Sequence, residues 1–87
     1  MACYIISYDV QSGGNYEPLY SAIKSYGTWA HINLSVWAVV TTNSAVQLRD
    51  HLQKHMRQGD RLLVIRSGTE AAWLNAICNN EWLKEHL

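Results

Sequence analysis

The sequence predicts an α+β fold of one domain, in which strands and helices follow the order βαββαβ and a helical extension comes last. Three observations support this prediction. The chain has 87 residues, which is enough for a single hydrophobic core and no more. Runs rich in β-branched and aromatic residues alternate with segments whose apolar residues recur at helical spacing. One strand run is apolar on both of its alternating faces, which indicates a strand covered above and below.

The first strand is expected over residues 3–10, where β-branched and aromatic residues dominate. Asp9 lies at the carboxyl end of this strand. A turn at residues 11–15, which contains two glycines, follows it. Such a turn either offers backbone N–H groups to a phosphate or is an ordinary flexible loop, and it lacks the spacing of a known phosphate-binding motif.

The first helix is expected after this turn. Pro18 suits the first turn of a helix, because its missing N–H has no intrahelical partner there in any case. Leu19, Ile23 and Tyr26 recur at spacings of four and three, which places them on one helical face. Gly27 is expected to end the helix in a left-handed conformation.

Residues 28–41 predict two strands joined by a tight connection near Asn33. The second of them, Leu34 to Thr41, carries apolar side chains on both faces. One face has Leu34, Val36, Ala38 and Val40, and the other has Trp37 and Val39. This pattern is typical of a central strand of a sheet that is covered on both sides.

A second helix and a fourth strand follow. Ser44 and Gln47 have the spacing of a capping box at a helix start. A stripe of apolar residues at helical spacing continues from there: Ala45, Leu48, Leu52 and Met56. Gly59 is expected to end this helix, and Arg61–Arg66 is expected to be the fourth strand.

The chain then divides into a core of residues 1–67 and a C-terminal tail of residues 68–87. Within the tail we expect a short amphipathic helix from Glu70 to about Ile77. Residues 81–87 are expected to form a last helical turn or a docking arm.

Two split βαβ units with right-handed crossovers give a ferredoxin-like sandwich, with a four-stranded antiparallel sheet and both helices on one side. The other sheet face cannot be polar, because the central strand is apolar on both faces. We expect it to be covered by the tail, by a second copy of the chain, or by both. Since 48% of the residues are apolar in so short a chain, we predict a homodimer.

Charge and cysteine content limit the class of partner. Seven basic and seven acidic residues balance to a net charge of zero, which argues against a broad electrostatic clamp on duplex nucleic acid. Cys3 and Cys78 show neither a metal-binding spacing nor a disulfide framework. Without a signal peptide or a long apolar run, the chain is expected to be cytoplasmic, with reduced thiols and no membrane contact.

Two groups of residues could carry chemistry. Asp9, at the end of a strand, either holds a hard cation such as Mg²⁺ or caps the following loop. In a twofold dimer two copies of Asp9 could share one ion. Ser35 and Trp37 place a hydroxyl and a large ring on one strand face, where they either pack in the interior or contact a nucleic acid.

Several short motifs resemble the CRISPR-associated "Cas-two" superfamily over nearly the whole chain. They are residues 4–9 (YIISYD), 35–37 (SVW) and 60–62 (DRL). Residues 70–73 (EAAW) and 82–83 (WL) are similar to the SinR-like branch, to which virulence-associated protein D is related.

This resemblance implies a ferredoxin-like homodimer with paired strand-end aspartates near a Mg²⁺ site. Members of the superfamily include metal-dependent ribonucleases and deoxyribonucleases, and also non-catalytic bridges. By the resemblance Asp9 is the metal ligand, and Tyr8 and Ser35 complete the catalytic site. Trp37 and Lys24 are then the nucleic-acid contacts, although Lys24 stands alone where the nucleases often carry arginines.

Two functions remain open at this stage. One is a Mg²⁺-dependent nuclease that acts on RNA or DNA. The other is a non-catalytic dimeric adaptor that presents its sheet edges or its tail to a protein partner, a role that the neutral charge favours.

Overall fold

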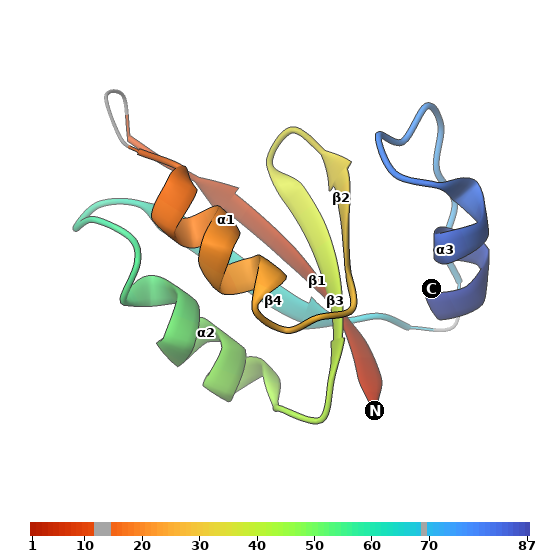
Figure 1. Ribbon diagram of the computed structural model, residues 1–87, viewed down its shortest axis with the longest axis horizontal. Coiled ribbons are helices and arrows are strands. Elements are labelled where there is room, and N and C mark those ends of the chain that lie inside the picture. Colours follow the sequence, from red (N-terminus) through yellow and green to blue (C-terminus); the bar gives the residue numbers. More distant parts are fainter. Residues whose placement is uncertain (12–14, 69) are drawn as a thin grey trace.

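Four strands form one antiparallel sheet in the order β2-β3-β1-β4 in the computed structural model, which describes residues 1–11, 15–68 and 70–87 (Figure 1). The turn residues Ser12, Gly13 and Gly14 lie outside the described residues. The fold is α+β, as the sequence predicts. Its elements are β1 (Ala2–Asp9), α1 (Glu17–Lys24), β2 (Trp29–Asn33), β3 (Val36–Thr41), α2 (Ala45–Gln53), β4 (Arg61–Arg66) and α3 (Asn80–His86).

The two central strands are β3 and β1. Ile5 of β1 lies opposite Ala38 of β3 on one side and opposite Ile65 of β4 on the other. β3 has a neighbour on each side, as its two-sided apolar pattern predicts. Its expected start was wrong by two residues, because Leu34 and Ser35 form the turn that reverses the chain between β2 and β3.

Helices α1 and α2 cover one face of the sheet, and Figure 1 shows them on the same side of it. Apolar residues of both helices interlock with alternate residues of β1 and β3. The fully buried side chains of this helix-covered core include Ile6, Leu19, Ile23, Trp37, Val39, Leu48 and Leu52. This layer therefore forms the main core of the domain.

The start of each of these helices agrees with its sequence signal. Pro18 lies in the first turn of α1. At α2 the capping box is complete, because the Ser44 N–H donates to Gln47 Oε1 at 2.8 Å and the Gln47 N–H donates to Ser44 Oγ at 3.2 Å. α2 thus begins where side chains satisfy its first N–H groups, whereas at α1 the Glu17 N–H donates to Asn15 Oδ1 at 3.1 Å and Pro18 has no N–H to satisfy.

The expected end of α2 at Gly59 was wrong, because the helix ends at Gln53. After that residue the N–H groups of Lys54, His55 and Met56 each donate to a carbonyl three residues back, as in a tightened final turn. Gly59 instead lies in the turn before β4 with a φ of 93°, a left-handed conformation that glycine adopts without strain.

The C-terminal tail covers half of the opposite sheet face. Leu83 of α3 is fully buried there against alternate residues of the sheet, namely Cys3, Ala30, Ile32 and Ala38. The Ile77 N–H also donates to the Ile32 carbonyl at 2.8 Å, which ties the tail to β2. The tail is therefore one of the expected covers of this face, over β2, β3 and the adjacent part of β1.

The other half of this face stays open. Leu63 and Ile65 of β4 are 58% and 47% exposed, although they stand in the middle of a strand. We call this region, formed by Ile5, Ser7, Asp9, Arg61, Leu63 and Ile65, the open half-face.

The expected helix from Glu70 to Ile77 is absent, because none of residues 70–77 lies in a helix. Asn75 adopts a φ of 54°, which interrupts helical geometry. So short a segment is also a poor helix by itself, and its Trp73 and Ala76 pack on the sheet instead. The helical turn expected near the C-terminus is present as α3, where the Asn79 side chain accepts from the Glu81 N–H at 2.7 Å.

Among the described residues, no helix combines the length and the apolar character that crossing a bilayer requires.

The docking of the tail yields a stability prediction. Leu83→Ala should lower the free energy of unfolding by about 2–5 kcal/mol, because it leaves a cavity between α3 and the sheet. Leu74→Ala makes the same chemical change at a largely exposed site of the same tail and should change it by less than about 0.5 kcal/mol. Urea titrations of the two variants measure the difference. Equal effects would mean that α3 does not dock on the sheet.

Candidate functional site

Asp9 lies at the carboxyl end of β1, opposite Arg61 at the start of β4. Asp9 Oδ2 and Arg61 Nη1 are 3.6 Å apart, and the two side chains are 71% and 78% exposed. An ion pair this exposed contributes at most about 1 kcal/mol to stability. The carboxylate is therefore accessible from solvent and only weakly held by its partner.

A shallow hollow of about 170 Å³ surrounds this ion pair. It is lined by Ser7, Tyr8, Asp9, Arg61, Leu62 and Leu63. Ser7 lies two residues before Asp9 and so projects on the same face of β1. Ser7 is not among the residues predicted from the sequence, although its spacing of two from Asp9 places it on the same strand face.

One group at this hollow, the Asp9 carboxylate, is of the type that binds Mg²⁺ in proteins. Mg²⁺ retains several waters and takes one or two carboxylates together with substrate phosphates, rather than a cage of protein ligands. Asp9 offers one such carboxylate, open to water. Within the described ranges no three His, Cys, Asp or Glu side chains gather as a metal site.

Tyr8 lies on the opposite face of the sheet from Asp9, inside the helix-covered core. Its hydroxyl donates to the Leu34 carbonyl at 3.1 Å and accepts from Trp37 Nε1 at 3.1 Å. Burial, the largest cause, and the neighbouring Tyr20 raise the pKa of Tyr8 well above its ordinary range. The phenol therefore stays neutral and joins the turn after β2 to the core.

Trp37 is also a core residue in this structure, with 2% of its surface exposed. The His31 ring stacks on it with centroids 4.2 Å apart and planes 10° apart. Ser35 lies in the turn before β3, where its carbonyl accepts from the Tyr8 N–H at 3.1 Å. Ser35 thus meets the end of β1 through its backbone and does not share a strand face with Trp37.

Lys24, the last residue of α1, lies beside two indole rings. Its Nζ is 5.3 Å from the centre of the Trp29 ring and 6.0 Å from that of Trp37. The structure therefore brings Lys24 and Trp37 together, but Trp37 is buried and does not reach the surface. These residues belong to the helix-covered side of the sheet, whereas Asp9 lies on the opposite face.

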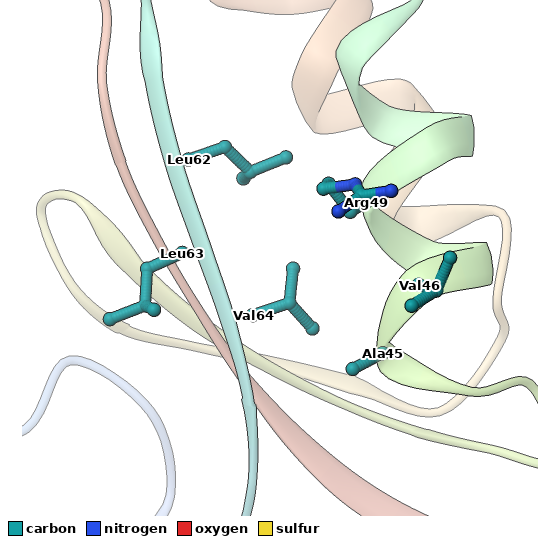
Figure 2. A pocket seen from close by; sticks show the side chains of 6 residues that line it. All are labelled: Ala45, Val46, Arg49, Leu62, Leu63 and Val64. Atoms are coloured by element: carbon teal, nitrogen blue, oxygen red, sulfur yellow. The ribbon is translucent and has the colours of Figure 1, made fainter.

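A larger hollow of about 290 Å³ lies along the outer edge of β4, beside α2. Figure 2 shows its lining residues: Ala45, Val46, Arg49, Leu62, Leu63 and Val64. Leu62 and Val64 point toward α2, whereas Leu63 points to the other side of the strand. Among the strands of the described residues, β4 has a neighbour only at β1, so this groove follows an open sheet edge.

Comparison with models of known protein families finds none that matches the chain.

The Tyr8 hydrogen bonds yield a prediction. Tyr8→Phe should lower the free energy of unfolding by about 1–3 kcal/mol, because the buried Trp37 N–H loses its acceptor. Tyr16→Phe removes a hydroxyl from a ring at the surface and should change stability by less than about 0.5 kcal/mol. Urea unfolding followed by tryptophan fluorescence tests both variants. If Tyr8→Phe has the same free energy of unfolding as the wild type, the structural role of this phenol is contradicted.

Proposed function

We propose that this protein is a homodimeric, Mg²⁺-dependent nuclease acting on single-stranded RNA, with Asp9 as its metal ligand. The proposal rests on one observation: the accessible carboxylate of Asp9 lies on the same open half-face as the exposed Leu63 and Ile65. Apolar surface in the middle of a sheet favours a partner, and a second copy is a partner that would bring another Asp9.

The open half-face has an apolar part and a charged end. Leu63 lies opposite Ser7 and Ile65 lies opposite Ile5, whereas Arg61 lies opposite Asp9 at the end of the two strands. A twofold axis that packs two such faces together buries the apolar parts. An axis close to the charged end also brings the two Asp9 side chains together, because an isologous interface repeats each residue on both sides.

This arrangement differs from a continuous sheet formed edge to edge through β4. In that alternative the two β1 strands are three strand spacings apart, so their Asp9 residues would be at least about 14 Å from each other. Only the face-to-face dimer would let two copies of Asp9 act on one ion. The proposed chemistry therefore depends on which part of β4 forms the interface.

At this site Asp9 would hold the ion, and Ser7 would line the approach to it. Bound Mg²⁺ supplies Lewis-acid polarisation of a phosphate and a water of lowered pKa. Arg61, which pairs with the Asp9 carboxylate, would compete with the ion for it. Once released, its guanidinium can bind a substrate phosphate in the bidentate manner typical of arginine.

The ferredoxin-like classification and the likeness to the SinR-like branch of the Cas-two superfamily belong to this proposal. The βαββαβ element order, the strand order β2-β3-β1-β4 and both helices on one face support them.

A second candidate function is that of a non-catalytic dimeric adaptor. The open edge of β4 favours it, because an extended segment of a protein partner could add to this edge. The groove beside α2 would accept apolar side chains of such a segment at Val46, Leu62 and Val64.

Cleavage assays separate the two functions. Wild-type protein and Asp9→Asn, purified side by side, are incubated with single-stranded RNA and Mg²⁺. Asp9→Asn should cleave at least about 10-fold more slowly. Even the mutation of a residue that only hydrogen-bonds to a metal ligand typically costs about 10- to 100-fold in metal affinity or activity. EDTA should stop the wild type. Equal cleavage by both proteins would indicate a contaminant, and no cleavage by either would favour the adaptor.

Light scattering tests the interface. Leu63→Lys puts a charge on the open half-face and should convert the dimer to a monomer. Val46→Lys is the matched control, since Val46 is similarly exposed but lies on α2 beside the β4 edge. If Val46→Lys separates the dimer and Leu63→Lys does not, the interface is the edge of β4. A monomeric wild type would contradict the shared site.

A further inference from the structure

A row of aromatic side chains reaches the surface between α1 and the edge strand β2. Tyr16, Tyr20 and Lys24 stand four residues apart and share one side of the α1 segment. Trp29 and His31 project from β2 on the helix-covered side of the sheet, at the strand spacing of two. We call these five residues the aromatic surface.

Three rings of this surface, those of Tyr16, Tyr20 and His31, contact one another in sequence. The ring centroids of Tyr16 and Tyr20 are 5.7 Å apart, and those of Tyr20 and His31 are 5.8 Å apart. Trp29 joins the row through the buried Trp37, whose ring centroid is 5.4 Å from its own. The aromatic surface is therefore a row of three rings with Trp29 beside it, and the core indole of Trp37 supports both from below.

Part of this aromatic area is open to solvent. Tyr16 is 40% exposed and Trp29 is 37% exposed, whereas the rings between them are half-buried. The stacked contact of His31 with Trp37 holds the imidazole in place. Exposed rings with fixed orientations lose little conformational entropy when a flat ligand stacks on them.

The same surface carries one cation. Lys24 Nζ lies 5.3 Å from the centre of the Trp29 ring, and Lys24 forms no ion pair with any described residue. Ion pairs in the described part of the chain use Arg49, Arg61 and Lys84 instead. Lys24 is thus available to an anionic group that approaches the rings.

We infer that the aromatic surface binds single-stranded nucleic acid, with unpaired bases stacking on Tyr16 and Trp29 and one phosphate at Lys24. The flat face of a base can stack on an aromatic ring of this surface. Its polar edge can form hydrogen bonds with the tyrosine hydroxyls, the imidazole nitrogens and the indole N–H. A duplex hides its base faces and needs many cations, which a chain of zero net charge does not supply. The inference deepens the proposed nuclease function, since it names the surface that holds the strand.

Binding can be tested without metal and therefore without cleavage. Fluorescence anisotropy of an end-labelled oligouridine is measured in EDTA. Trp29→Ala and Tyr16→Ala should each weaken binding by about 5-fold to 150-fold, the range for loss of one stacked base. Trp82→Ala is the matched control, because it removes a half-buried indole from α3 on the opposite side of the sheet. Circular dichroism checks whether each variant is folded. If Trp29→Ala does not fold, Tyr16→Ala alone decides the test.

Two further measurements separate stacking from charge. Lys24→Ala should reduce the slope of log affinity against log salt by about 0.7, as expected for one single-strand phosphate contact. Lys84→Ala, a change at another exposed lysine, which lies on α3, should leave the slope unchanged. An abasic strand of the same length loses both stacking contacts, so it should bind the wild type at least as weakly as oligouridine binds Trp29→Ala.

The inference is overturned if the ring variants bind oligouridine as tightly as the wild type does. It is also overturned if the wild type binds the abasic strand as tightly as it binds oligouridine. It is also overturned if Tyr16→Ala and Trp29→Ala change the oligomeric state instead of the affinity, because the surface would then be an interface between copies. Its failure is distinct from that of the proposed function. If cleavage depends on Asp9 but not on these rings, the inference is wrong. If these rings bind the strand but no cleavage occurs, the proposed function is wrong.

Discussion

The two-sided apolar character of the central strands constrains the rest of this structure. β1 and β3 bury side chains on both faces, so each face of the sheet needs a cover. Helices α1 and α2 cover one face completely enough to form the main core. A chain of this length has only α3 and the segment before it for the other face, and these reach β2, β3 and part of β1. The exposed apolar residues of β4 are the consequence.

The alternation of side chains along β1 separates two kinds of surface. Tyr8 and Asp9 are adjacent in sequence, yet one points into the helix-covered core and the other into the open half-face. A site built on Asp9 therefore recruits Ser7 and Arg61, not Tyr8. Tyr8 instead fixes the turn after β2 and accepts the Trp37 N–H, and so supports the aromatic surface from inside.

The proposed nuclease thus has its metal ligand and its strand-binding rings on opposite sides of one thin sheet. The two sides meet at the end of β1, where Tyr16 lies 6.0 Å from Tyr8, as measured between ring centroids. An RNA strand held on the aromatic surface would have to pass this end to reach Asp9. In a homodimer, the Asp9 pair would stand between two such surfaces, one from each copy.

Local patterns in the sequence determined the elements and much of the core. The capping box at Ser44, the fourth strand at Arg61–Arg66 and the central place of β3 follow from side chains close in sequence or from strict alternation. Only the tertiary structure decided that Arg61 lies against Asp9, that Trp37 is buried and that residues 70–77 form no helix. Those outcomes depend on strand register and on which segment packs on the apolar face of the sheet. Both are set by contacts between residues far apart in the chain.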